Sequence, residues 1–348
     1  MAADQAREPS VSRVATPRPS QRGQRGGNSA FDNLRLFTGN AHPVLASRIA
    51  EHLGVRLGAM TTTRFNDGEI RVQVEESARG MDVFIVQPTC APVNDNLMEL
   101  LIMIDAFRRA SAERITVVLP YYGYARQDKK VKPREPVTAR LVADLITEAG
   151  ATRAVCIDLH AGQIQGFFRI PMDHLFAGPL LAEYWMSKGF GDGTTCVVSP
   201  DVGGVTRAKS MAEMLKTSLA IIAKRRPEPG KVEIMEIIGD VRGKQCILID
   251  DMIDTGGSIV HGAEQLMERG AAAVYACCTH PVLSQGAIDR IAASPIQKLV
   301  TTDTLPFRHP HLVDDEHIEV LSVAPLLADA IRRIHTDDSV SELFDRTW

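Results

Sequence analysis

The stretch Cys246-Ile-Leu-Ile-Asp-Asp-Met-Ile-Asp-Thr-Gly-Gly-Ser258 decides the fold, because it joins an apolar strand to a helix through a polar turn. The strand runs into two carboxylates, Asp250 and Asp251, and a third, Asp254, follows them. The two glycines allow a tight turn that brings backbone N–H groups close to a ligand. The N-terminus of the following helix carries partial positive charge, so the stretch predicts an anion-binding site.

The side chains of this turn indicate which anion it holds. Thr255 and Ser258 can donate hydrogen bonds to phosphate oxygens, whereas Asp250 and Asp251 would repel the same phosphate. We expect these two carboxylates to accept hydrogen bonds from sugar hydroxyls or to reach a metal. A phosphate beside a sugar indicates a ribose 5-phosphate group. The competing interpretation makes Asp254 a helix N-cap and the glycines a plain turn, but the upstream aspartates argue against it.

Outward from this stretch, strand and helix signals alternate along the chain. The expected strands are Leu34–Phe37, Asp82–Gln87, Ile115–Leu119, Ala154–Ile157, Thr195–Ser199, Leu219–Ile222, Cys246–Ile249, Val274–Cys278, Leu299–Thr302 and Ile318–Leu321. The expected helices are His42–Leu53, Asn94–Arg109, Pro136–Ala149, Val205–Leu215, Gly257–Arg269 and Pro325–Ile334. This alternation predicts an α/β fold of mainly parallel sheets flanked by helices. The 348 residues suit two domains, which we expect at 31–178 and 179–348.

Residues 1–30 differ from the rest of the chain. They are rich in Arg, Ser, Pro, Gly and Gln and poor in large apolar residues, so they cannot bury enough surface to fold. We expect a disordered N-terminal extension or a start codon assigned too early. An organelle transit peptide is the weaker interpretation, because no amphipathic helix is evident.

The bulk composition excludes several classes of protein. A formal net charge of −4 and the lack of a basic helix argue against nucleic-acid binding. The six cysteines form no C-x-x-C pair and lie mostly in apolar runs, as buried thiols in a reducing compartment do. No apolar run approaches the roughly 20 residues that span a bilayer. We therefore expect a soluble, cytoplasmic protein that contacts no membrane.

Five further segments indicate which function the chain performs. They are Arg64-Phe-Asn-Asp-Gly-Glu69, Pro120-Tyr-Tyr-Gly-Tyr-Ala-Arg-Gln-Asp-Lys-Lys130, Asp158-Leu-His-Ala-Gly-Gln-Ile-Gln-Gly-Phe-Phe168, Val197-Val-Ser-Pro-Asp-Val-Gly-Gly204 and Lys224-Arg-Arg-Pro227. With the turn after Asp250, and in this order, they resemble the class I ribose-phosphate diphosphokinases, also called phosphoribosyl-diphosphate synthetases. The resemblance extends from residue 31 to the end of the chain.

The resemblance implies a fold and a reaction. The fold is a pair of phosphoribosyltransferase-like α/β domains with the active site between them. The reaction moves the diphosphate group of ATP to the 1-hydroxyl of ribose 5-phosphate and gives 5-phosphoribosyl 1-diphosphate and AMP. The family also implies Mg²⁺, a homohexamer, activation by phosphate and inhibition by ADP.

The resemblance also assigns roles to residues by position. For ATP they are Phe65, Asp67, Gly68 and Glu69 from an adjacent chain, with Arg126 and Gln127. For the metal they are His160 and Asp201, and the catalytic cations are Lys224 and Arg226. For ribose 5-phosphate they are Arg226, Asp250, Asp254, Thr255, Gly256, Gly257 and Ser258. For the allosteric phosphate and ADP site they are Ser77, Arg79, Ser339 and Ser341.

The chemistry of the implied reaction is consistent with these residue types. Diphosphoryl transfer spreads negative charge over phosphate oxygens, so catalysis rests on positioning and on cations, including those of a mobile loop. A Lys-Arg-Arg run is otherwise most often a solvated patch, and a lone histidine after a strand is most often structural. The departures from the family pattern are few: Ala223 replaces an acidic residue, and Ser258 replaces threonine.

Three other functions compete with this interpretation. A phosphoribosyltransferase would share the turn but would need only one such domain. A non-catalytic paralogue would be expected to lose cations such as Lys224 and Arg226, yet both are present. A nucleotide-binding regulator that acts on nucleic acid conflicts with the net charge of −4.

Overall fold

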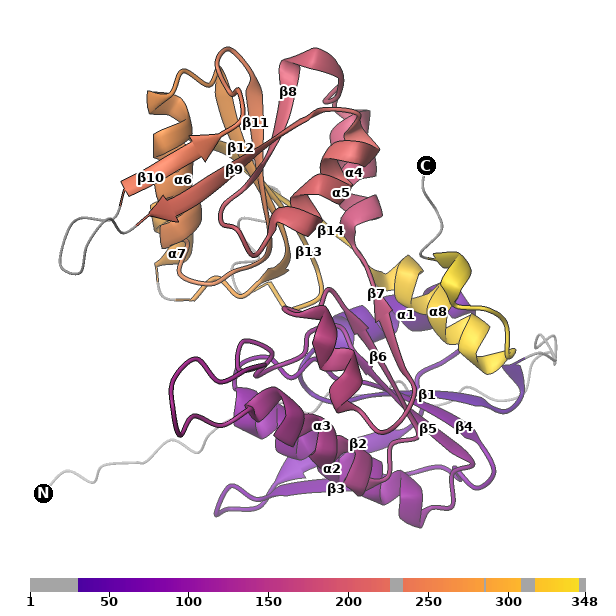
Figure 1. Cartoon of the computed structure of the whole chain (residues 1–348). Helices are drawn as coiled ribbons and strands as arrows, with labels where there is room; N and C mark the ends of the chain where they lie inside the picture. Colours follow the sequence, from indigo (N-terminus) through magenta and orange to yellow (C-terminus); the bar gives the residue numbers. More distant parts are fainter. Residues whose placement is uncertain (1–30, 226–233, 285, 308–316, 344–348) are drawn as a thin grey trace, which may run out of the picture.

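A five-stranded parallel sheet organises the first half of the computed structural model, which describes residues 31–225, 234–284, 286–307 and 317–343. Its strands are β1 (Leu34–Thr38), β4 (Asp82–Val86), β5 (Arg114–Leu119), β6 (Arg153–Ile157) and β7 (Met172–Leu175), in the order β1-β4-β5-β6-β7. The central strands are apolar on both faces, as expected where helices cover both sides. The lower, indigo-to-magenta half of Figure 1 shows this unit.

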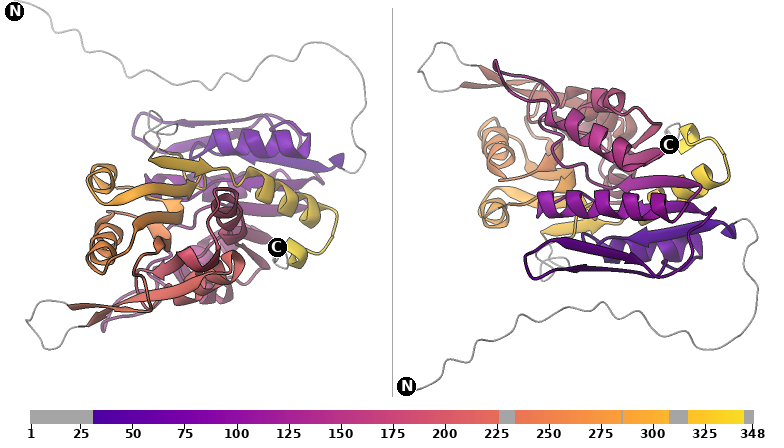
Figure 2. Two further views of the ribbon diagram at one scale, coloured as in Figure 1. Left: turned by 90° about the horizontal axis from the view of Figure 1, so that it is seen from above. Right: turned by 90° about the horizontal axis from the view of Figure 1, so that it is seen from below.

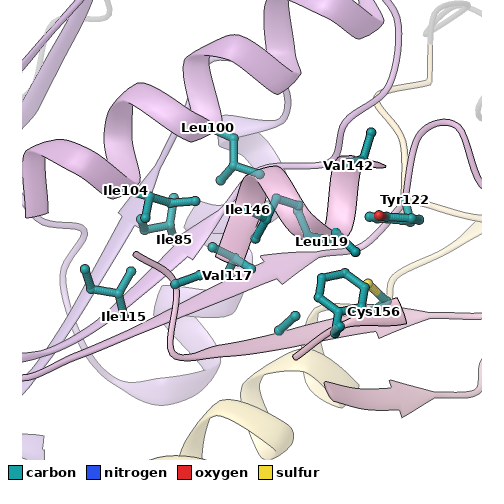
Figure 3. Close-up of a cluster of buried hydrophobic side chains, with 14 of the residues drawn as sticks. Ile85, Leu100, Ile104, Ile115, Val117, Leu119, Tyr122, Val142, Ile146 and Cys156 are labelled. Carbon is teal, nitrogen blue, oxygen red and sulfur yellow. The ribbon is translucent and has the colours of Figure 1, made fainter. Parts of the chain in front are cut away.

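Helices α2 (Val93–Arg109) and α3 (Thr138–Ala149) cover one face of the first sheet. Figure 3 shows Leu100 and Ile104 of α2 above the strand side chains Ile85 and Val117. The helix places Leu100, Ile104 and Phe107 on one face, because residues three and four apart lie on the same side of an α-helix. This cluster of buried side chains fixes α2 and α3 to the sheet.

A seven-stranded sheet organises the second half. Its strands are β8 (Thr195–Ser199), β9 (Ser218–Arg225), β10 (Ile234–Ile238), β11 (Gln245–Ile253), β12 (Ala273–Pro281), β13 (Ile296–Thr302) and β14 (Ile318–Leu321), in the order β10-β9-β8-β11-β12-β13-β14. Among the described strands of this sheet, β9 and β10 pair antiparallel and the other neighbours pair parallel. Helices α4 (Gly178–Ser187) and α5 (Val205–Leu215) cover one face. Helices α6 (Gly257–Glu268) and α7 (Ala287–Ala292) cover the other.

The last helix, α8 (Ala324–His335), returns to the first sheet. It packs against α1 (Pro43–Leu53), and both helices join the buried cluster on the other face of the first sheet. Figure 2 shows α8 in yellow beside the indigo α1. The range 179–348 expected for the second domain therefore contains one helix that packs on the first sheet, because α8 buries its apolar face there.

A two-stranded antiparallel hairpin, β2 (Met60–Arg64) and β3 (Ile70–Val74), packs against α2. In Figure 1 it lies at the opposite end of the molecule from α6. Among the described residues, no helix combines the length and apolar character needed to cross a membrane. The predicted α/β class, with mainly parallel sheets flanked by helices, is confirmed.

Candidate active site

The turn after β11 has the conformation that its sequence predicts. Gly256 adopts a φ of +77° and is buried, and α6 begins at Gly257. A Cβ atom at Gly256 would lie 3.4 Å from the carbonyl oxygen of Ala287, an ordinary contact, so the positive φ is what favours glycine here. Thr255, Gly257 and Ser258 are exposed. The N-terminus of α6 and two hydroxyl groups therefore open to the surface, as an anion site requires.

The segment after β12 supports this turn, and the sequence analysis did not identify it. The backbone N–H of Ser284 donates to the carbonyl oxygen of Asp254 at 3.0 Å, and the Ser284 hydroxyl donates to Asp254 Oδ1 at 2.5 Å. The Arg290 guanidinium of α7 donates to the carbonyl oxygen of Thr255. These contacts fix the turn against the neighbouring strand connection.

The aspartate pair at the end of β11 meets groups from two other elements. His160 Nδ1, which follows β6 of the first sheet, lies 2.8 Å from Asp251 Oδ2. Arg207 Nη1 of α5 lies 3.5 Å from Asp250 Oδ1 and 3.7 Å from Asp251 Oδ1. The structure thus brings the predicted sugar-binding and metal-binding residues together. It adds Arg207, which no local pattern in the sequence had indicated.

The pKa values of this cluster follow from burial and charge. Burial, and then the negative charge of Asp251, raises the pKa of Asp250. Burial also acts to raise the pKa of Asp251, but the hydrogen bond with His160 and the charge of Arg207 outweigh it and lower that pKa. The hydrogen bond with Asp251 raises the pKa of His160 despite the opposing effect of burial. Asp251 is therefore the more acidic member of the pair.

An ion pair joins the two units next to the turn. Arg126, in the segment after β5, donates from Nη1 to Asp254 Oδ2 at 2.5 Å. The two side chains are 53% and 28% exposed, so the pair lies at the open surface of the site. The neighbouring Gln127 accepts a hydrogen bond from the Thr138 hydroxyl. A predicted ATP contact and a predicted ribose 5-phosphate contact are thus bonded to each other.

A buried polar network lies behind the site. Asp158, two residues before His160, accepts a hydrogen bond at Oδ2 from the Thr279 hydroxyl at 2.6 Å and from the Ala177 N–H at 3.0 Å. The ring of His280 lies 3.0 Å from the carbonyl oxygen of Asp158. Asp158 adopts a φ of +39°, a conformation that these partners maintain. Residues of both units therefore fix the backbone that leads into His160.

These groups share a location in the two sheets. The turn follows β11, His160 follows β6, Asp201 follows β8 and Arg126 follows β5, so each lies beyond the carboxyl end of a parallel strand. Ligands of open α/β sheets bind at that edge. Asp201 is exposed and accepts at Oδ1 from the Gly204 N–H at 2.8 Å, which leaves its second oxygen available to a ligand.

The remaining predicted residues lie elsewhere or outside the described range. The backbone of Lys224 lies in β9 opposite Met235, and Arg226 lies outside the described residues. Phe65, which is 52% exposed, lies in the β2–β3 turn with Asp67, Gly68 and Glu69, at the far end of the molecule from α6. One chain therefore does not bring this turn to its own phosphate-binding turn.

The four residues predicted for the allosteric site are exposed. Ser77 and Arg79 precede Gly80, whose N–H donates to the carbonyl oxygen of Ser111, two residues after α2. Ser339 and Ser341 follow α8, and the carbonyl oxygen of Ser339 accepts from Arg333 at 2.7 Å.

Comparison with known proteins identifies the family. Residues 34–150 match the N-terminal domain of ribose phosphate pyrophosphokinase, and residues 228–345 match the phosphoribosyl synthetase-associated domain. The chain is 59% identical over 313 residues to the ribose-phosphate pyrophosphokinase of Caldanaerobacter subterraneus subsp. tengcongensis, across 90% of this chain and 98% of the relative. It is 56% identical over 314 residues to the one of Clostridium tetani, with the same coverage.

A solved structure supports the same family. The phosphoribosylpyrophosphate synthetase of Mycobacterium smegmatis superposes with a TM-score of 0.81 at 47% identity, over 88% of this chain and all of that one. Sequence identity of this extent over nearly the full length of each relative leaves one assignment: the chain belongs to the ribose-phosphate pyrophosphokinase family.

Proposed function

We propose that the chain performs the reaction of its family at the edge where its two sheets meet. The observation that carries this proposal is the contact between His160 of the first unit and Asp251 of the second, beside a phosphate-binding turn. In the reaction, the 1-hydroxyl oxygen of ribose 5-phosphate attacks the β-phosphorus of ATP and loses its proton. The bond from the β-phosphorus to the oxygen that bridges it to the α-phosphorus breaks, AMP leaves with that electron pair, and the proton of the hydroxyl passes to solvent.

The residues of this chain divide the work between binding and charge stabilisation. Thr255, Gly256, Gly257 and Ser258 hold the 5-phosphate, with the N-terminus of α6 facing it, and Asp254 accepts a hydrogen bond from the ribose. Asp250 accepts hydrogen bonds from the ribose hydroxyls. Arg126 and Gln127 position ATP. The cations Lys224 and Arg226 stabilise the charge that develops on the transferred group, and Arg226 also contacts the sugar phosphate.

Magnesium is the cofactor that these side chains suit. Among the described residues no three His, Cys, Asp or Glu side chains cluster as a protein-only metal site. Mg²⁺ is commonly held by one or two protein ligands together with phosphate oxygens and water. Asp201 and His160 would supply the protein ligands, since each keeps one atom available beside its hydrogen bond. When bound, Mg²⁺ neutralises charge on the phosphate oxygens.

A homohexamer would complete the ATP site. The turn that contains Phe65, Asp67, Gly68 and Glu69 lies far from α6 of the same chain, so it would serve an adjacent subunit. Ser77, Arg79, Ser339 and Ser341 would form the site where phosphate activates and ADP inhibits. Burial of all six cysteines supports a reducing, cytoplasmic location.

AMP release tests this proposal. The chain is incubated with ATP, ribose 5-phosphate, Mg²⁺ and phosphate, and each component is omitted in turn. AMP that forms only when the sugar phosphate and the metal are present supports diphosphoryl transfer, and loss of activity without phosphate supports the class I assignment. A folded chain that releases no AMP under any condition would favour the non-catalytic paralogue.

A further inference from the structure

We propose that the ion pair between Arg126 and Asp254 couples the binding of ATP to the binding of ribose 5-phosphate. The inference rests on the proposed function, because it takes Arg126 as an ATP contact and Asp254 as a ribose 5-phosphate contact. In the structure the side chains of these two residues are hydrogen-bonded to each other. Either substrate therefore competes with a residue that belongs to the other substrate's site.

The geometry of the pair sets the two uses of each side chain in competition. Arg126 Nη1 lies 2.5 Å from Asp254 Oδ2, and the Ser284 hydroxyl lies 2.5 Å from Oδ1 of the same carboxylate. Both carboxylate oxygens are thus engaged from within the protein. A ribose hydroxyl that donates to Asp254 competes with Arg126 or Ser284, and an ATP phosphate that accepts from Arg126 Nη1 competes with Asp254.

Both side chains are charged while they are paired. Burial acts to raise the pKa of Asp254, but its hydrogen bonds with Ser284 and Arg126 outweigh burial and lower it. The hydrogen bond with Asp254 raises the pKa of Arg126. The pair therefore opposes ATP by occupying Arg126, the cation that would otherwise face its phosphates.

Coupling between the substrates follows from this competition. When ATP draws Arg126 away, Asp254 is left with an oxygen free to accept from the sugar. When ribose 5-phosphate binds Asp254 first, Arg126 is released for ATP. Each substrate thus lowers the free-energy cost of binding the other substrate. Thermodynamic linkage requires the two enhancements to be equal. The pair lies at an exposed surface, so we expect an enhancement of roughly 3- to 10-fold.

Binding of an ATP analogue to the full-length chain tests the inference. The probe is α,β-methylene-ATP with Mg²⁺, in which the bond that breaks in the reaction is replaced. Its dissociation constant is measured by calorimetry with and without ribose 5-phosphate. In the unaltered chain each ligand tightens the other. In Asp254→Asn the analogue alone binds roughly 3- to 10-fold more tightly, because Arg126 is released, and ribose 5-phosphate no longer improves it.

Asp250→Asn is the matched control. It makes the same change of side chain in the same segment, but Asp250 contacts Arg207 instead of Arg126. Its affinity for the analogue alone should stay within about twofold of the unaltered chain, as expected without a direct contact. Equal tightening in both variants would overturn the inference, because general repulsion would then explain the effect. The reciprocal change, Arg126→Gln, should tighten ribose 5-phosphate when it binds alone.

The outcomes separate this inference from the function on which it rests. If the unaltered chain binds neither ligand and releases no AMP, the proposed function fails. If the chain releases AMP but Asp254→Asn binds the analogue no more tightly than the unaltered chain does, the function stands and the coupling is refuted.

Discussion

Arg207 contacts both aspartates of the acidic cluster. It lies between Asp250 and Asp251 and is 23% exposed. No sequence pattern indicated it, because its partner Asp250 is 43 positions away and a helical arginine is normally a surface residue. By contrast, the local strand-to-turn sequence did predict that the aspartates themselves form a site.

Arg207→Ala should therefore destabilise the protein and reduce its activity. Two aspartates would keep their burial but lose a cation, at a cost of about 1–3 kcal/mol in the free energy of unfolding. Urea unfolding measures this change, and AMP release measures the loss of turnover. Arg207→Lys should recover part of both, because it keeps the charge. An unchanged unfolding midpoint in Arg207→Ala would show that the cluster needs no cation.

Lys224 should matter for turnover and not for folding. A cation that stabilises the transferred group acts mainly in the transition state, so Lys224→Ala should lower kcat by at least about 100-fold. Circular dichroism and thermal unfolding should remain close to those of the unaltered chain. A variant with full turnover would remove Lys224 from the catalytic assignment.

At the scale of elements, the sequence predicted the strands and helices whose own residues have a clear apolar pattern, and it did not predict those without one. The β11–turn–α6 segment, the other predicted strands and the helices all have a continuous apolar run or a helical stripe. The hairpin β2–β3, β7, α4, β10 and α7 were not predicted. Strand β2 is the polar run Met60–Arg64, and β7 has only four residues. Helix α4 has a block of apolar residues at Leu180–Leu181 and at Tyr184–Met186 in place of a clear stripe.

The turn of β11–α6 offers a direct test at Gly256. Its φ of +77° disfavours any side chain, so Gly256→Ala should cost about 1–2 kcal/mol in stability and weaken ribose 5-phosphate binding. Gly257→Ala is the control for stability. A Cβ there meets only the Thr255 hydroxyl, at 3.8 Å. Thermal unfolding compares the two variants, and equal midpoints would contradict the requirement for a left-handed residue at Gly256.

At the scale of the whole molecule, the two units are held together by buried polar contacts and by a returning helix. Thr279 of β12 reaches Asp158 across 121 positions of sequence, and His42 Nε2 lies 2.9 Å from the carbonyl oxygen of Asp303. Helix α8 adds an apolar contact with α1. Contacts between such distant residues leave no trace in a single sequence, which is why the return of α8 was not predicted.

Thr279→Val should reveal how much the hydrogen bond between Thr279 and Asp158 contributes to the free energy of unfolding. The substitution keeps the side-chain shape but removes the hydroxyl that donates to Asp158, at a cost of about 1–3 kcal/mol for a hydrogen bond to a charged group. Thr279→Ser should retain most of the stability, because it keeps the hydroxyl. Chemical unfolding distinguishes the two. If valine and serine have the same effect, packing and not the hydrogen bond accounts for the contribution of Thr279.

Transfer of an intact diphosphate group is the central claim, and ³¹P NMR of the reaction mixture tests it most directly. The chain is mixed with ATP, ribose 5-phosphate, Mg²⁺ and phosphate, and the products are followed over time. The predicted result is AMP together with a sugar diphosphate ester, whose two phosphorus resonances are coupled to each other, in equal amounts and without ADP. The appearance of ADP with a sugar carrying only single phosphates would contradict the account.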